Sequence, residues 1–225
     1  VVFALAAGPL FFSPESVKVH QQVSYHGLPW RQLRGQLMAE FGVGVDFMTS
    51  SAIWAIFVGL AVFGLESDVV YAQLGVLASV TMLAAFAAAK IFGAVVDHRR
   101  GRQLLRTGVA ADAILHLLRP FVTTPMGVLL INIGNQTATT AYAIPFTKGL
   151  FDQADALPGY RIIYMSVMSC SAALGAAFMA VVAVLLSIFV QDDISALQLA
   201  FLPASLLVLG ILLHRFPSLA KRLIL

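Results

Sequence analysis

Charged residues are scarce in this sequence: Asp, Glu, Lys and Arg make up 11% of its 225 residues, whereas soluble domains carry roughly a quarter. Apolar residues account for 60% instead. A soluble fold of this length would need far more polar surface than these residues supply. The composition therefore excludes an ordinary soluble domain and predicts a chain that lies in a lipid bilayer.

Cysteine is almost absent as well. Cys170 is the single cysteine, so the chain can form neither an internal disulfide nor a cysteine metal site. The five histidines do not cluster with carboxylates at the spacing of metal ligands, apart from one pair, and we find no Gly-rich phosphate loop. We therefore expect no metal, no cofactor and no enzymatic activity.

Six apolar segments are long enough to cross a hydrocarbon core, which takes about 20 helical residues. They cover residues 46–65, 71–95, 103–119, 124–146, 161–189 and 195–214. The third segment is short and rather polar, and the fifth is long enough to tilt. The sequence therefore predicts an all-α membrane protein with six transmembrane helices over residues 46–214.

The part of the chain before these segments divides into two. Residues 1–12 are apolar but too short to span, and without a basic start or a cleavage site they favour the end of a truncated transmembrane helix over a signal-peptide remnant. Residues 13–45 form the longest polar stretch. Four apolar residues repeat there at helical spacing: Trp30, Leu33, Leu37 and Phe41. This pattern predicts an amphipathic helix, either on the cytoplasmic membrane surface or packed on the protein as a linker.

The basic residues predict the orientation, because cytoplasmic loops collect Lys and Arg. If the six segments alternate, Arg119 alone among the 14 Lys and Arg residues lies at the opposite surface. Both ends of the six-helix block and the tail, residues 215–225, are then cytoplasmic, and we expect a protein of the plasma (inner) membrane. The net charge of +3 reflects this bias, so no nucleic-acid partner is expected.

A polar stretch, GAVVDHRRGRQLL at residues 93–105, joins the second and third segments. It resembles the loop signature of the major facilitator superfamily, which joins the second and third helices of a six-helix half. His98 stands where that family usually has Arg or Lys, and the second glycine comes one residue late. The resemblance implies a gating loop, whereas the other interpretation is an ordinary positively charged loop. The residues that carry the resemblance are Gly93, Asp97, Arg99, Arg100, Gly101 and Arg102.

The order of an apolar stub, a polar stretch and six segments resembles the end of a sixth helix, the central loop and the carboxy-terminal half of a family member. The resemblance implies a secondary active transporter that moves a small solute by alternating access, with this chain as roughly half of it. Its partners would be the lipid bilayer and an amino-terminal six-helix half. An amino-terminal half with a long leader also fits the six segments but leaves the stub unexplained. The alternative from another class is a self-contained six-helix protein, such as a channel-like oligomer, a scaffold or an intramembrane enzyme.

The fourth segment is the richest in polar residues, which recur every three to four positions. Polar side chains are costly in hydrocarbon unless they face partners or water, so this face either lines a cavity or bonds neighbouring helices. The resemblance places the fourth and first segments at the central cavity. The candidate cavity-lining residues are Asn132, Asn135, Gln136, Thr139 and Tyr142, with Thr49 and Trp54 from the first segment. Small residues in the fifth segment, such as Ser171 and Gly175, indicate close helix packing.

The third segment carries Asp112, His116 and Arg119, whose spacing of four and three residues places them on one helix face. We expect Asp112 near the middle of the membrane and Arg119 at the outer surface. A buried carboxylate one turn from a titratable imidazole suits the coupling of transport to protons. The helix at this place in the family is usually peripheral, so a structural role for Asp112 and His116 is the interpretation we favour.

Overall fold

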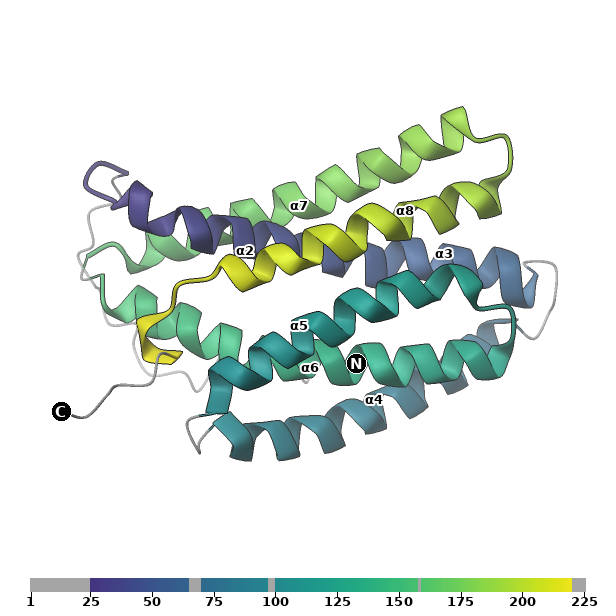
Figure 1. Cartoon of the computed structure of the whole chain (residues 1–225), viewed down its shortest axis with the longest axis horizontal. Helices are drawn as coiled ribbons and strands as arrows, with labels where there is room; N and C mark the ends of the chain where they lie inside the picture. The colour runs from purple at the N-terminus through teal and green to yellow at the C-terminus, as the bar shows by residue number, and fades with distance from the viewer. Residues whose placement is uncertain (1–24, 65–69, 97–99, 158, 220–225) are drawn as a thin grey trace, which may run out of the picture.

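The computed structural model describes residues 25–64, 70–96, 100–157 and 159–219, which are almost entirely helical and include no strand (Figure 1). The long helices coincide with the six predicted segments, apart from shifts at their ends. In chain order the α-helices are α2 (Trp30–Met48), α3 (Trp54–Val58), α4 (Val70–Val95), α5 (Gly101–Leu118), α6 (Pro125–Asp155), α7 (Arg161–Phe189) and α8 (Asp193–Val208). Two π-helical stretches, Thr49–Ile53 and Gly59–Phe63, join and extend α2 and α3, and a 3-10 stretch, Leu209–Leu213, extends α8.

Four of these helices are long and apolar enough to cross a membrane. They are Trp30–Phe63, Ala72–Val95, Arg161–Phe189 and Asp193–Leu213. The prediction of a helical membrane protein is therefore confirmed. The helices α5 and α6 are not among the four, because α5 holds three charged residues in 18 positions and α6 carries many amides and hydroxyls.

The first helix begins earlier than the predicted first segment. It runs without a break from Trp30 to Phe63, over 34 residues, whereas we predicted a span from residue 46 and a separate amphipathic helix before it. Such a helix is about 51 Å long at 1.5 Å per residue, well beyond the roughly 30 Å of a hydrocarbon core. Its early part is held on α7, where the Ser171 hydroxyl donates to the Leu37 carbonyl at 2.7 Å. The predicted stub, residues 1–12, lies outside the described residues.

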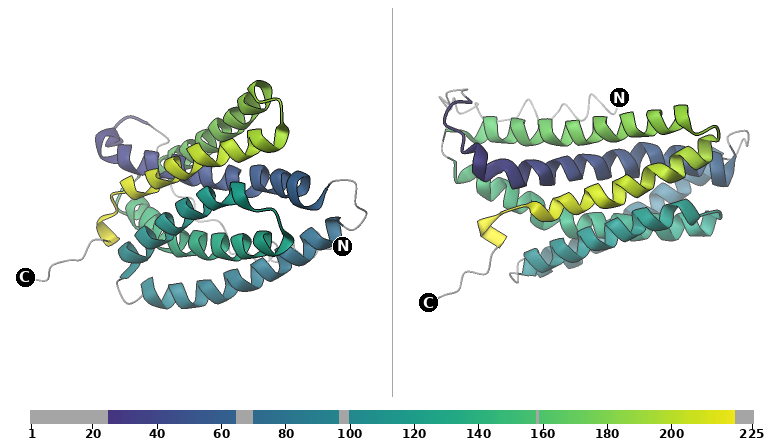
Figure 2. Two further views of the ribbon diagram at one scale, coloured as in Figure 1. Left: turned by 45° about the vertical axis from the view of Figure 1, so that its right-hand side comes forward. Right: turned by 45° about the horizontal axis from the view of Figure 1, so that its top comes forward.

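The helices run side by side along the long axis and form two groups (Figures 1 and 2). One group contains α2, α3, α7 and α8, and the other contains α4, α5 and α6. The groups meet where α5 packs on α8 and where side chains of α2 reach α6. Segments far apart in the sequence therefore supply the two sides of this junction.

Glycines set how closely α2 and α7 approach. A Cβ atom added at Gly44 would overlap the carbonyl oxygen of Ala172, and one added at Gly175 would overlap that of Phe41. Each helix therefore presents a bare backbone to the other, which lets the two axes come close, as small residues do in membrane helix pairs.

The predicted loop signature lies partly outside the described residues, since Asp97, His98 and Arg99 are not among them. Gly93 lies in the last turn of α4, and no described atom comes within 4 Å of where its Cβ would be. Gly101 is buried instead and packs against Pro145 of α6, while Arg100 and Arg102 are exposed. The second glycine of this stretch thus makes a close contact with a neighbouring helix, and the gating role of the stretch stays a prediction.

Candidate functional site

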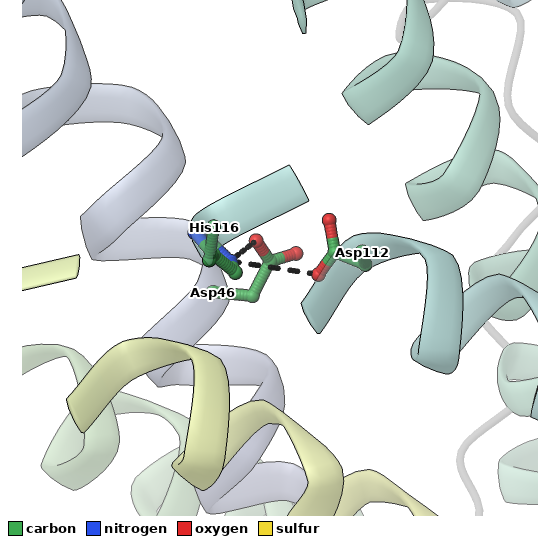
Figure 3. Close-up of side chains that lie close together, drawn as sticks. All are labelled: Asp46, Asp112 and His116. Atoms are coloured by element: carbon green, nitrogen blue, oxygen red, sulfur yellow. Dashed lines mark hydrogen bonds and ion pairs between the residues drawn. The ribbon is translucent and has the colours of Figure 1, made fainter. Parts of the chain in front are cut away.

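A buried set of polar side chains lies where the two helix groups meet, and we call it the polar cluster. Figure 3 shows its centre, where dashed lines join the His116 ring to the Asp46 and Asp112 carboxylates. Asp112 and His116 are 0% exposed and Arg119 is 1% exposed. The members of the polar cluster are Asp46, Ser50, Asp112, His116, Arg119, Asn135 and Tyr142.

Asp46 of α2 is the most fully bonded carboxylate in the polar cluster. Its Oδ1 atom accepts from the Ser50 hydroxyl at 2.7 Å and lies 3.2 Å from Nε2 of His116. Its Oδ2 atom accepts a hydrogen bond from the Tyr142 hydroxyl. Donors from α5, from α6 and from the π-helical stretch that follows α2 thus converge on one anion, and such charge-assisted bonds stabilise its ionised form.

Arg119 does not reach the outer surface, and that prediction is wrong. Its Nη2 atom donates to Asn135 Oδ1 at 2.6 Å and to the Ser50 hydroxyl at 2.9 Å, and its guanidinium carbon lies 5.1 Å from the centre of the Trp54 ring. The side chain can turn inward because α5 ends at Leu118 and the chain continues in a 3-10 turn. An imidazole nitrogen, a hydroxyl, an amide oxygen and an aromatic face then replace water around the cation.

The contact between Arg119 and His116 determines which nitrogen of the imidazole carries hydrogen. Nη1 of Arg119 lies 2.8 Å from Nδ1 of His116, and a guanidinium can only donate. Nδ1 must therefore accept, which assigns the hydrogen to Nε2. A singly protonated, neutral His116 thus presents its N–H to Asp46 at 3.2 Å and to Asp112 at 3.6 Å.

Asp112 differs from Asp46 in having no donor. Both of its carboxylate oxygens are buried, and no hydrogen bond reaches either of them from the part of the chain that the structure describes. The Nε2 atom of His116 lies 3.6 Å from the Oδ2 atom of Asp112, beyond hydrogen-bond distance. The polar cluster therefore contains one carboxylate, Asp46, that accepts from three donors and one, Asp112, that accepts from none among the described residues.

The same residues have the makeup of a metal site, because ligand atoms of Asp46, Asp112 and His116 lie within 4.8 Å of one another. A metal needs the lone pair of the imidazole nitrogen, however, and Nε2 carries hydrogen here. Freeing that lone pair would move the hydrogen to Nδ1 and set it against the Arg119 guanidinium. The donor set in this arrangement therefore does not fit a metal ion.

A pocket of about 340 Å³ opens beside the polar cluster, between α2 and α6. This volume lies within the range of small-ligand sites, roughly 300–1,000 Å³. Its polar lining residues are Asp46, Ser50, Ser51, Asn135, Gln136, Thr139, Tyr142 and Thr147. Four of the five predicted residues of α6 thus lie around one cavity.

The other three predicted cavity residues do not line this pocket. Asn132 lies one turn before Asn135 and accepts a hydrogen bond from the Trp54 indole nitrogen at 2.6 Å. Thr49 is fully buried and donates to the Val45 carbonyl at 2.8 Å. Asn132 and Trp54 therefore bond the two helix groups together, and Thr49 bonds its own helix.

Asp46 and Ser50 are site residues that the sequence analysis did not identify. Asp46 is the first residue of the predicted first segment. A signal was present, since a carboxylate within an apolar helix is a functional candidate and Ser50 follows one turn later on the same face. What the sequence does not contain is their pairing with residues 69 to 96 positions away.

No protein-family model, curated protein or solved structure matches this chain. The polar cluster and the pocket are therefore the features that bear on its function.

Proposed function

We propose that this chain is about half of a secondary active transporter, which moves a small solute by alternating access and resembles the carboxy-terminal half of the major facilitator superfamily. The pocket between α2 and α6 is the observation that carries the proposal. It has the volume of a small-solute site, its walls carry several amides and hydroxyls, and it lies where two helix groups meet. Transporter folds place their solute sites at such junctions of helix groups.

The burial of the polar residues of α5 and α6 supports a six-span arrangement. Neither helix is among the four that are long and apolar enough to cross a membrane by themselves. Asp112, His116 and Tyr142 nevertheless turn toward the protein interior, so their polar groups need not meet lipid. A membrane helix tolerates ionisable residues that face the interior of the bundle. We therefore count α5 and α6 as the third and fourth spans, with both ends of the six-helix block cytoplasmic in a plasma (inner) membrane.

The open side of the pocket supports a second set of helices as partner. Phe47 lines the pocket and is 67% exposed, so the pocket wall is incomplete on that side. Helix α4 packs on α6, and only 6% of an apolar 18-residue stretch of α4 is buried. An amino-terminal six-helix half would supply the missing wall and cover apolar surface, whereas in a self-contained six-helix protein this surface would face lipid.

Cysteine accessibility tests the proposal on the natural full-length protein. With Cys170→Ser as background, Phe47→Cys is treated with a membrane-impermeant maleimide in right-side-out and inside-out vesicles. Alternating access predicts modification from both sides, because each conformation opens the pocket to one side. Phe86→Cys on the exposed face of α4 is the control and should stay unmodified.

Modification of Phe47→Cys from one side only would contradict alternating access. Ionic current through the purified protein in a planar bilayer would instead favour the channel-like alternative. The pocket would then be a pore lining, and no solute would need to be bound.

A further inference from the structure

The charges of the polar cluster do not balance. The ionisable groups that face Asp112 are Asp46 from α2, His116 from its own helix, Arg119 from the turn that follows and Tyr142 from α6. His116 is neutral because Arg119 occupies its Nδ1 side, and a tyrosine hydroxyl that donates a hydrogen bond is neutral as well. Two carboxylates and one guanidinium then belong to the cluster, so one negative charge has no counterion among these described groups.

The excess charge belongs to Asp112 and not to Asp46. Asp46 has three donors, from Ser50, His116 and Tyr142, whereas neither oxygen of Asp112 has any among the residues that the structure describes. Asp112 is also 0% exposed, so bulk solvent does not reach its carboxylate. An unpaired carboxylate in a dry interior is strongly disfavoured, and one bound cation would remove the cost.

We propose that Asp112 is a cation-binding site whose ligand is a single exchangeable proton. The carboxylate takes the proton from a hydronium ion, so that one O–H bond forms on Asp112 and one water molecule is released. The polar cluster then has no net charge. In the reverse step water takes the proton back, and the cluster returns to one negative charge.

The geometry favours a proton over a metal ion or sodium. A transition metal is excluded from Nε2 of His116 by the hydrogen that this atom carries. An alkali cation needs a shell of several oxygen ligands, but the oxygens of Asp46 already accept from three donors and leave Asp112 alone. A proton needs only one oxygen and no additional space.

The position of the polar cluster gives the proton a connection to the pocket. Asp46 lines the pocket, Asp112 does not, and the Nε2 atom of His116 lies within 3.6 Å of a carboxylate oxygen of each (Figure 3). A solute in the pocket would therefore lie beside Asp46, which connects Asp112 to the pocket through His116. The use of this proton in transport rests on the proposed function, whereas its binding to Asp112 does not.

Infrared difference spectroscopy on the reconstituted full-length protein tests the proposal. In a Glu40→Gln background, which removes a second buried carboxyl, raising the pH should remove a carbonyl band of a protonated carboxylic acid from the otherwise wild-type protein. Asp112→Asn should lack this band, and Asp112→Glu should shift it. Asp152→Asn, which removes an exposed carboxylate at the end of α6, should leave it unchanged.

Thermal stability gives a second measurement that does not depend on transport. The melting temperature of the wild type should fall as the pH rises and Asp112 loses its proton, because the folded state then contains an unpaired charge. Asp112→Asn carries a neutral side chain of the same shape and should lose that part of the pH dependence. Asp152→Asn should follow the wild type.

Three results would overturn the proposal. The first is a pH-sensitive carboxyl band that persists in Asp112→Asn, or the absence of any such band. The second is a rise in melting temperature with sodium that Asp112→Asn abolishes. The third is binding of one equivalent of Zn²⁺ or Mn²⁺ that His116→Gln abolishes. The Phe47→Cys experiment separates the two proposals. Modification from one side only contradicts the transporter, even if the Asp112 band is present. Modification from both sides without the Asp112 band contradicts the proton site alone.

Discussion

At the residue scale, Arg119 shows how one side chain holds the polar cluster together. It contacts His116 of α5, Ser50 of the first helix and Asn135 of α6, so it joins both helix groups. It also sets the tautomer of His116, which keeps the imidazole neutral and places hydrogen on Nε2, where a metal would need a lone pair. The fork of N–H groups matters here as much as the charge, because the guanidinium holds three acceptors in fixed directions.

Arg119→Lys keeps the charge but removes this fork, so it should lower the free energy of unfolding by about 2 kcal/mol, the usual range for lost hydrogen bonds to a charged group. Denaturant unfolding of the purified protein measures the loss. Arg106→Lys, an exposed position on α5, is the matched control and should change little. Equal stabilities of the two variants would show that Arg119 acts only as a point charge.

At the element scale, the contact between α2 and α7 depends on two bare backbones. Gly44 faces the carbonyl of Ala172, and Gly175 faces the carbonyl of Phe41. The small residues of the fifth segment led us to predict close packing there, and the structure places Gly175 at this contact. The partner glycine on the first helix, Gly44, was not predicted, because the need for a glycine there depends on a backbone that lies far away in the sequence.

Gly44→Ala should separate α2 from α7 and lower the free energy of unfolding by about 1–3 kcal/mol or more, the range for overpacked sites. Gly75→Ala on α4 is the control, since no described atom lies within 4 Å of its new Cβ. Helix propensity alone predicts that this control is more stable by up to about 1 kcal/mol. Unfolding in a series of denaturant concentrations compares the two, and a tolerated alanine at residue 44 would contradict the close contact.

The start of α8 provides a pH-dependent prediction. The pKa of Asp192 is lowered by its hydrogen bonds with Ser195, whose backbone N–H donates to Asp192 Oδ2 at 2.9 Å. A lowered pKa means that the cap stabilises the folded state above the ordinary pKa of the carboxyl and that this stability is lost as the pH falls through the lower, folded-state value. Hydrogen exchange of the Ser195 amide should therefore lose protection in acid. Asp192→Asn keeps a capping oxygen without the charge, so its protection should not respond to acid in this way.

At the scale of the whole molecule, the apolar composition of the helices indicates four membrane-spanning helices, whereas the burial of polar side chains allows six. Four helices are apolar enough by themselves, while α5 and α6 carry polar residues that the fold turns inward. If these two helices cross the membrane, the α5–α6 turn and the α6–α7 turn lie on opposite sides. If they do not, both turns lie on one side.

Thr123→Cys and Ala156→Cys, placed singly in a Cys170→Ser background, distinguish these arrangements, because both positions are exposed and each belongs to one of the two turns. Six spans predict that an impermeant maleimide modifies Ala156→Cys from the cytoplasmic side and Thr123→Cys from the other. Modification of both from the same side would remove α5 and α6 from the membrane. The proposal of a six-helix transmembrane half would then be wrong.

The sequence by itself determined the features that depend on local spacing and on composition. Apolar content and segment length are properties of the chain alone, so the membrane character and the positions of the long helices followed from them. The shared face of Asp112, His116 and Arg119 followed in the same way from 3.6 residues per turn. Only the tertiary structure decided which residues those three meet. Asp46 pairs with His116 across 70 positions of sequence, and Arg119 turns inward, because the helix groups place donors and acceptors opposite one another. No local pattern contains that information, since such a pairing depends on which helices pack together.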